Sequence, residues 1–581
     1  MGGFVGCAGL DAARGIAVVE SMLLAECVAR APVRGQGSLV VFGARDVELA
    51  EVGDGALALV GYARQGARRV DAAALLKLWR AGGVAALEPL AGEYVIAVRE
   101  GRETIVARDR YGSRPLYVAS LPGGGVAFAT SMGPLVAAGV SPEADRDGVV
   151  QSLILGYVPA PQTALLHVRQ LGPGEAWTLA PRRRKEAWYV AREKIDPRRT
   201  LAAAARALDR AVTRAVTRAL PPSGRVGAFL SGGLDSSLVL ARAHEAGCDV
   251  DAYTLHFGDD LPSELPYARA VADHLGVRHH VLELDARRFC DALEPSLVHL
   301  EDLLSEPIAV PNFLLAREAS RSCDLLLTGE GGDPSFGGPK NIGMALAYAY
   351  GAKPPAPTLA EAYLASHHHL GDDLDAALAP EWRASFDRAG LEQRVAARID
   401  PSSRSRAGAR RPGETFVGRL MCTNIVTKGG NNILVKVAKM VSAAHDVALR
   451  SPLFDREVVE LALTIPPWQK LSGTEEKLVL KRAAARSLPR GVIDRSKRGM
   501  AVPLSAWLRG ELGVLAKDVL TERSVRERGL FRWPYVERLL RHERQPTDLA
   551  RSRSAEKLWL VLIAELHQRA MTRLGAARRA A

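Results

Sequence analysis

The stretch VGAFLSGGLDSSLVL, residues 226–240, joins an apolar run to a loop of small residues and then to a second apolar run. This order predicts a buried strand, a tight turn and a helix. Glycines let the backbone turn with its N–H groups exposed, and hydroxyls and the helix N-terminus add further donors. No Gly-Lys-Ser/Thr follows, so this is not the Walker pattern. The loop predicts a phosphate site, and Asp235 within it suits Mg²⁺ bridging the phosphates. The phosphate-binding candidates are Ser231, Gly232, Gly233, Asp235, Ser236 and Ser237.

A second acidic loop, TGEGGDPSFGG at 328–338, follows the apolar run at 325–327. Between 200 and 340, single apolar runs alternate with helical patterns, which predicts a parallel sheet with helices on its faces. Ligands of such sheets gather at the carboxyl ends of the strands. We therefore expect both loops to face one pocket, where Asp235 and Asp333 share the metal and Glu330 acts as a general base.

The chain is long enough for more than one domain, and its balance of 48% hydrophobic and 24% charged residues is typical of folded proteins. From about 1 to 180, short apolar runs between Gly and Pro predict a β-rich layered domain, with a helix at 70–82. The basic, Pro-bounded segment at 180–199 predicts a linker. After about 340 the pattern is mostly helical. The predicted domains are 1–190 and 200–581.

The net charge of +12 is scattered along the chain. Its densest parts, at 181–199, at 402–411 and after Arg569, do not interleave aromatic residues as a stacking platform does, so we expect no nucleic-acid binding. The six cysteines lie far apart without a CxxC pair, and no apolar stretch is long enough to span a bilayer. The opening Met-Gly does not match the myristoylation pattern, because position 6 is glycine. These features predict a cytoplasmic protein with reduced thiols and no membrane contact.

Four segments together resemble the asparagine synthetase family: SGGLDSS, TGEGGDPSFGG, RSPLFDREVVELALTIPPWQKL (450–471) and DRSKRGMAVPLSAWLRGEL (494–512). GEYVIAV, VARDRYGSRPLYVA and LGYVPAPQTALLHVRQLGPGEAWTL are similar to its glutaminase domain. The resemblance implies an α+β N-terminal Ntn-hydrolase-like αββα sandwich. It implies that an α/β parallel-sheet domain of the adenine nucleotide α-hydrolase-like (PP-loop) type follows, with a helical C-terminal part. The family activates a carboxylate as its AMP ester, releases pyrophosphate and lets ammonia or an amine displace AMP.

The resemblance also implies roles for individual residues. Glu330 would deprotonate the attacking nitrogen, and Lys497 would neutralise charge that develops at the phosphate. Without the resemblance, Lys497 is one surface lysine in a basic loop. Thr254 and Phe257 would lie at the adenine pocket, although an ordinary buried strand explains them equally. The implied ligands are ATP and Mg²⁺, with Gly329 and Gly331 also lining the phosphate site.

The N-terminal part departs from the glutamine-hydrolysing members of the family. Those begin Met-Cys-Gly, and the cysteine is nucleophile and base through its own α-amino group. Here position 2 is Gly2, and Cys7 is expected inside the first strand, where its amide is internal. The family's Asn-Gly-Glu segment falls where this chain has Leu59-Val60-Gly61-Tyr62. Both differences predict that the N-terminal domain keeps the fold without hydrolysing glutamine.

Three further positions bear on the substrate. Pro334 replaces the second acid of the family's Asp-Glu-Leu-Phe-Gly-Gly-Tyr, and Ala448 stands where the family typically has Glu, so aspartate is in doubt as the substrate. The related β-lactam synthetases, which close a ring within one molecule, carry Tyr where this chain keeps Glu330. A carboxylate base suits capture of an external ammonia or amine.

Two other stretches contain residues that could form a functional site. SHHHLGDDLD at 366–375 sets three histidines beside three aspartates, but it lacks a defined ligand spacing, so a solvated helix end is favoured over a metal site. SEPIAVPNF, around Glu306, resembles a family segment before the second loop and otherwise reads as a Pro-punctuated turn.

The leading hypothesis is an ATP-dependent, AMP-forming amide ligase that joins a small-molecule carboxylate to ammonia or an amine. Its nitrogen would come from free ammonia, a small amine or a partner glutaminase, and a homodimer is a further possibility. Ring closure, as in β-lactam or lasso-peptide synthetases, is the alternative within the superfamily. A homologue that only binds nucleotide is the alternative of another class.

Overall fold

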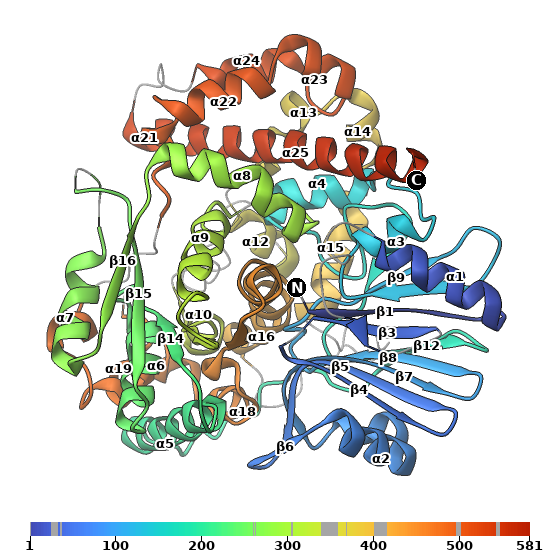
Figure 1. Cartoon of the computed structure of the whole chain (residues 1–581). Helices are drawn as coiled ribbons and strands as arrows, with labels where there is room; N and C mark the ends of the chain where they lie inside the picture. Colours follow the sequence, from blue (N-terminus) through green and yellow to red (C-terminus); the bar gives the residue numbers. More distant parts are fainter. Residues whose placement is uncertain are drawn as a thin grey trace.

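The structure is a computed structural model of the 581-residue chain. It describes residues 2–24, 33–34, 38–43, 45–259, 261, 263–303, 306–338, 358–367, 369–399, 415–473, 475–495, 501–541 and 547–580. Figure 1 shows two antiparallel sheets formed by the N-terminal residues beside a separate sheet formed by the middle of the chain.

Residues 3–187 form two stacked antiparallel sheets with helices on both outer faces; we call this part the sandwich. The first sheet has the order β11-β9-β10-β1-β3-β2 and the second the order β13-β12-β8-β7-β5-β4, with β6 beside β5. The strands are β1 (Gly3–Ala8), β2 (Val33–Arg34), β3 (Leu39–Phe42), β4 (Val47–Val52), β5 (Gly55–Gln65), β6 (Arg68–Val70), β7 (Leu90–Glu100), β8 (Glu103–Arg108), β9 (Tyr117–Ser120), β10 (Val126–Ala129), β11 (Val168–Gln170), β12 (Glu175–Ala180) and β13 (Arg184–Ala187).

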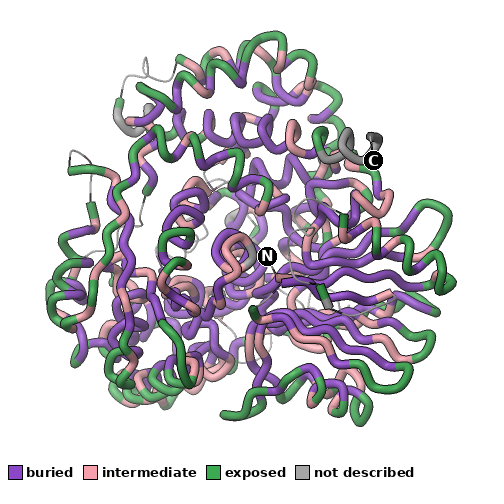
Figure 2. Tube along the Cα trace, in the orientation of Figure 1, coloured by how far each residue is buried: buried purple, intermediate pink, exposed green. Residues whose placement is uncertain are grey.

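Alternation of side chains gives the sandwich three apolar layers. Phe4, Val95 and Phe128 lie in the cluster between the two sheets. The other face of the first sheet packs on α1 (Ala12–Leu23) and α3 (Gly133–Ala137), and the other face of the second packs on α2 (Ala72–Gly82). The predicted order of layers, α, β, β and α, is therefore observed. Figure 2 shows that the central strands are buried along most of their length, whereas β13 is exposed or half-buried throughout.

The change of architecture falls between β13 and α5 (Leu201–Ala219), in the later half of the predicted linker. The earlier half of that segment is not a linker, since β13 pairs with β12. From α5 on, which we call the parallel-sheet part, five strands pair in parallel in the order β16-β15-β14-β17-β18. They are β14 (Val226–Phe229), β15 (Val250–His256), β16 (His279–Glu283), β17 (Leu325–Leu327) and β18 (Ala448–Arg450). Chain order runs outward in opposite directions from β14, so the loops after β14 and β17 lie at a topological switch point.

Helices cover both faces of the parallel sheet. One apolar cluster joins it to α5, α6 (Leu234–Glu245), α7 (Leu265–Leu275), α18 (Arg456–Thr464) and α19 (Leu478–Ala484). The other joins it to α8 (Ala286–Leu300), α9 (Ala309–Ala319) and the C-terminal helices. These include α21 (Leu504–Trp507), α22 (Glu511–Val519), α23 (Glu522–Arg528), α24 (Trp533–Leu540) and α25 (Asp548–Ala580), drawn in red in Figure 1. The parallel-sheet part contacts the sandwich through α16 (Phe416–Asn424) and two π-helical segments, η4 (Ile425–Leu434) and η5 (Ala438–Ala443).

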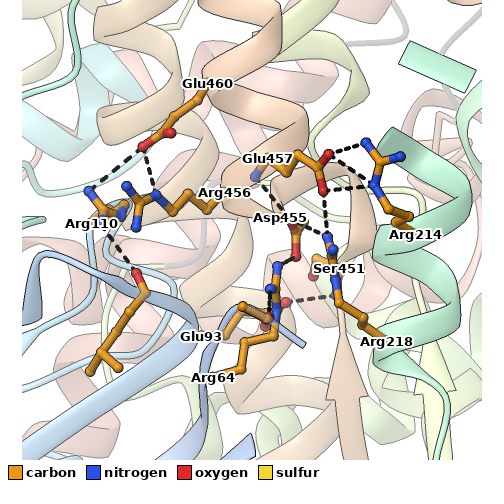
Figure 3. A network of polar contacts seen from close by, with 12 residues as sticks. Arg64, Glu93, Arg110, Arg214, Arg218, Ser451, Asp455, Arg456, Glu457 and Glu460 are labelled. Carbon is orange, nitrogen blue, oxygen red and sulfur yellow. Dashed lines mark hydrogen bonds and ion pairs between the residues drawn. The ribbon is translucent and has the colours of Figure 1, made fainter. Parts of the chain in front are cut away.

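Polar contacts cross from the sandwich to the parallel-sheet part at several places. Figure 3 shows one such network, in which Arg64 and Glu93 of the sandwich meet Asp455 and Ser451. The same Asp455 also accepts from Arg218 of α5, at 3.2 Å. Arg64 and Asp455 are both buried, so this ion pair joins the two parts in the interior of the molecule.

No helix of the described residues has the length and apolar character that crossing a membrane requires. The five cysteines that the structure describes are free thiols.

Candidate active site

The loop after β14 forms one wall of a pocket of about 420 Å³. Gly232 turns the chain with φ +68°, and a Cβ there would lie 2.5 Å from the backbone nitrogen of Ala268, so only glycine fits. Gly233 is the N-cap of α6 and has no side chain to accept from the first-turn amides. The N-terminus of α6 therefore presents its amides to the pocket as an anion site would.

Hydroxyls of the same loop hold its shape. The Ser236 Oγ donates to the Gly233 carbonyl at 3.2 Å and lies 3.1 Å from the Ser231 Oγ. The Ser231 Oγ in turn accepts from the Gly233 amide at 3.2 Å. These bonds keep the two hydroxyls beside the amides that line the pocket.

The loop after β17 packs directly on the first loop, as the sequence predicts. A Cβ on Gly329 would lie 2.5 Å from the Ser236 amide nitrogen, and one on Gly332 would lie 2.3 Å from the Asp235 carboxyl carbon. Gly331 adopts φ +113° against the backbone of Leu453. Absence of side chains at these glycines lets the two loops meet at one edge of the sheet.

Asp235 and Asp333 converge on one cation, the Lys477 ammonium, which forms an ion pair with each. Lys477 is the N-cap residue of α19 and is buried. Burial by itself would lower the pKa of Lys477, but the carboxylates of Asp235 and Asp333 outweigh it and raise that pKa above its usual value. The two aspartates thus form a site that already holds positive charge.

The predicted residues divide into those on the pocket wall and those elsewhere. Glu330 lies on the wall and is half-buried. The remaining wall residues from the prediction are Ser231, Gly233, Asp235, Ser236, Gly329 and Asp333. Gly232, Gly331 and the fully buried Ser237 support the loops from outside the wall that the described residues form. Lys497 lies outside the described residues.

Thr254 and Phe257, expected at the adenine pocket, lie elsewhere. Thr254 is buried, donates to the Leu230 carbonyl at 2.6 Å and contacts His279. Because strand side chains alternate, its neighbours Tyr253 and Leu255 line the pocket instead. Phe257 packs edge-on against Trp507. These two positions therefore give no support to the adenine assignment.

The rest of the wall has an apolar side and a charged rim. The apolar side chains are Leu255, Ile308, Leu315, Val437, Val492 and Ile493. At the rim, Arg495 pairs with Glu264 and covers the Tyr267 ring, and Lys481 lies 3.4 Å from Glu475. The pocket can hold a flat apolar group beside its anion-binding end.

A second charged group lies near Glu330. Glu306 sits between Lys436, at 3.1 Å, and Lys428, at 3.6 Å. Burial opposes its ionisation, but the two lysines lower the pKa of Glu306 to about 2. Burial lowers the pKa of Lys436, and Glu306 and Glu330 partly oppose this. Glu306 is thus one member of a partly buried ionic cluster, which a Pro-punctuated turn does not predict.

Sequence reasoning missed Lys477 and the cluster around Glu306. Lys477 lies 242 positions after Asp235, and a lysine before an Ala/Leu/Arg helix carries no local pattern. Among the described residues, no three His, Cys, Asp or Glu side chains gather as a metal site. The stretch at 366–375 is not a solvated helix end either, since His367 is buried and Asp373 binds Lys557 and Tyr535. His368 lies outside the described residues.

The supposed glutaminase end of the sandwich has little free space. Gly2, Val60 and Val95 line a cavity of about 50 Å³, which Glu301 and Lys439 close from the parallel-sheet part. This volume suits a few water molecules. Cys7 is buried in β1, its thiol donates to the Gly15 carbonyl, and burial raises its pKa to about 11.

Comparison with known proteins agrees with the geometry. The asparagine synthase family model matches residues 207–570, and the glutamine amidotransferase domain model matches residues 59–190. A homologue named for glutamine-hydrolysing asparagine synthetase in Mycobacterium tuberculosis is 29% identical over 76% of this chain and 72% of its own. The Bacillus subtilis asparagine synthetase 1 is 24% identical over 85% of this chain and 80% of its own.

A β-lactam-forming enzyme is also similar. The carboxyethyl-arginine β-lactam synthase of Streptomyces clavuligerus is 30% identical over 46% of this chain and 50% of its own. The family model covers the two loops, Lys477 and most of the parallel-sheet part, which is more than half of the sequence. The chain belongs to the asparagine synthase family.

Proposed function

We propose that the protein is an ATP-dependent, AMP-forming amide ligase. It adenylates a small-molecule carboxylate and joins it to ammonia or an external amine, in a domain spanning 200–581. The observation that carries this proposal is the convergence of Asp235, Asp333 and Lys477 beside a pocket with one anion-binding end, one apolar side and Glu330 on its wall.

In the first half-reaction, a carboxylate oxygen of the substrate attacks the α-phosphorus of ATP, and the bond to the bridging oxygen of pyrophosphate breaks. The amides of α6 and the hydroxyls of Ser231 and Ser236 bind the phosphate oxygens. Lys477 supplies positive charge where the leaving pyrophosphate gains negative charge. The apolar side of the pocket accepts the adenine. We also propose that Lys497 supplies a second positive charge at the phosphates.

In the second half-reaction, the nitrogen attacks the acyl carbon, and the bond to the AMP oxygen breaks. An ammonium-derived nitrogen must lose protons as the C–N bond forms. Glu330, whose carboxylate lies on the pocket wall, accepts one of them as general base. AMP leaves with the electron pair of the broken bond, and the products are the amide, AMP and pyrophosphate.

Mg²⁺ fits the residues present. Carboxylate oxygens are the ligands it prefers, and Asp235 and Asp333 already converge on a shared cation, Lys477. The two aspartates would hold the ion, which would neutralise phosphate charge when bound. Lys477 would then be freed to bind a phosphate oxygen itself.

We also propose that the sandwich, residues 1–190 with the Ntn-hydrolase-like topology, does not hydrolyse glutamine. Cys7 is buried in mid-strand with a raised pKa and its backbone amide donates to Ser38, so it is neither terminal nor available. The cavity at Gly2 measures about 50 Å³. Ammonia, a small amine or a separate glutaminase would then supply the nitrogen, in the cytoplasm.

Ring closure within one substrate is the second candidate, because the β-lactam synthase of Streptomyces clavuligerus is 30% identical over 278 residues. Glu330 favours the intermolecular reaction, since the resemblance gives the ring-closing β-lactam synthetases Tyr at this position and this chain keeps a carboxylate there.

The test is carboxylate-dependent exchange of labelled pyrophosphate into ATP, measured over a panel of carboxylic acids. The proposal expects exchange with at least one acid in the wild type and loss of about a hundredfold or more in Asp235→Ala. Gly491→Ala is the matched control, because a Cβ there meets nothing within 4 Å. Absence of exchange with every acid, together with intact ATP binding, would support the nucleotide-binding homologue instead. Glutamate release from glutamine alone would contradict the inactive sandwich.

A further inference from the structure

The loop that carries Glu330 and Asp333 is held in place by β18 and the turn that follows it. The Thr328 amide donates to the Arg450 carbonyl at 3.0 Å, and β17 pairs in parallel with β18 up to that point. A Cβ on Gly331 would lie 2.8 Å from the carbonyl carbon of Leu453. The backbone of 450–453 therefore fixes the base of the loop at 328–333.

Four side chains of the sandwich contact the segment 449–451. We call them the clamp: Asp46, Tyr62, Glu93 and Arg114. Asp46 accepts two hydrogen bonds from the Arg450 guanidinium, one of them at 2.8 Å, and both side chains are only 8% exposed. The Tyr62 ring lies 4.1 Å below the same guanidinium. These two contacts fix the side chain of Arg450 from both the edge and the face.

The other two members of the clamp bind the backbone on either side of Arg450. Glu93 accepts from the Ser451 amide at 2.7 Å, a contact visible in Figure 3. Arg114 donates to the Leu449 carbonyl at 3.5 Å. Three consecutive residues of the parallel-sheet part, 449–451, are thus held by the sandwich at four points.

The clamp includes Tyr62, from the segment 59–62 where the resemblance predicts the family's Asn-Gly-Glu. A cavity of about 50 Å³ lies beside Val60 and Arg114. A buried bidentate Arg–carboxylate pair is geometrically restrictive, so it fixes one arrangement of the two parts.

From these contacts we propose that the sandwich has become a positioning element for the ligase site. Asp46, Tyr62, Glu93 and Arg114 act through Arg450 and Ser451 to order the loop at 328–333, and through it the carboxylates of Glu330 and Asp333. The functional consequence rests on the proposed ligase activity, whereas the structural consequence, an ordered loop, does not.

Hydrogen–deuterium exchange on the full-length protein tests the structural consequence independently of the functional one. Asp46→Asn is nearly isosteric and removes the charge that holds Arg450, and Tyr62→Leu is a milder second variant. Both are expected to speed exchange of the 325–338 peptide about tenfold. Glu301→Gln is the matched control, because Glu301 is also buried, pairs with Lys439 at 3.0 Å and accepts sandwich amides, yet does not touch 449–453. It is expected to leave that peptide unchanged.

MgATP binding, measured by calorimetry on the same proteins, reports whether the ordered loop serves the site. Asp46→Asn is expected to weaken binding about five- to tenfold, and Asp46→Glu, which retains the charge, to restore it. Unchanged exchange at 325–338 in both Asp46→Asn and Tyr62→Leu, or equal change in Glu301→Gln, would overturn the positioning role. If the wild type does not bind MgATP but both variants still speed exchange at 325–338, the proposed ligase function is contradicted and the positioning role of the clamp is retained.

Discussion

At the scale of single residues, Cys7 bears on the proposal that the sandwich does not hydrolyse glutamine. Its thiol is buried against α1 and its pKa is about 11, so at pH 8 only about one molecule in a thousand carries the reactive thiolate. We expect iodoacetamide at pH 8 to leave Cys7 unmodified in the native protein and to alkylate it in guanidinium chloride. Peptide mass spectrometry measures both, and rapid native modification would contradict the burial of this thiol.

Lys470 is a buried amine, and within the described part of the chain no carboxylate lies within ion-pair distance of it. Its ammonium lies 3.6 Å from the Met421 sulfur, and burial lowers the pKa of Lys470 to about 8. A lysine whose folded pKa lies below its unfolded value destabilises the fold at low pH, and stability rises as pH increases from about 8 toward the unfolded value.

Lys470→Met is therefore expected to stabilise the protein at pH 7 by about 1–3 kcal/mol, because it removes a charge from an apolar setting. The gain should shrink as the pH rises above 8, since the wild-type lysine is then neutral when folded. Thermal unfolding of both proteins at pH 7 and pH 9.5 measures this gain in stability. Loss of stability at pH 7, or an equal gain at both values, would contradict the assignment.

At the scale of elements, the contact between the loops after β14 and β17 is the feature most sensitive to a single added atom. Gly332→Ala places a methyl group on the Asp235 carboxylate rather than on backbone. We expect carboxylate-dependent exchange to fall about a hundredfold, because a displacement of about 1 Å at a reacting group has this effect. The melting temperature should change little.

Gly329→Ala provides the contrast, since its Cβ would meet the Ser236 backbone nitrogen. That variant is expected to lower the melting temperature as well as the activity. Equal melting temperatures for the two variants, both below the wild type, would show that Gly332 is needed for folding rather than for the placement of Asp235.

These elements also show what sequence alone could predict. The strand at 226–229, the helix after it and the strand at 325–327 follow from local periodicity and turn chemistry, and the structure confirms them. The position of Thr254 could not be predicted, because the run at 250–257 mixes polar and apolar residues on both faces of the strand and does not reveal which face meets the pocket. Lys477 and the Glu306 cluster depend on tertiary contacts that no spacing encodes.

At the scale of the whole molecule, the two parts share one continuous interior. Glu301 accepts from the Met132 and Gly133 amides at 2.9 and 2.8 Å and pairs with Lys439, while Arg64 pairs with Asp455. The antiparallel sandwich and the parallel sheet were predictable because their strand patterns differ in kind. The contacts between them were not, since each pairs residues more than a hundred positions apart and leaves no periodic trace.

As a whole, the molecule is proposed to make an amide from a carboxylate, ATP and a nitrogen donor other than its own glutaminase. The most direct measurement is product analysis with an acid that supports pyrophosphate exchange, given ammonium or an amine in one reaction and glutamine in another. The account predicts equal amounts of AMP, pyrophosphate and amide with ammonium or the amine, and no amide with glutamine. Formation of ADP and phosphate, or amide formation from glutamine by the purified protein, would contradict it.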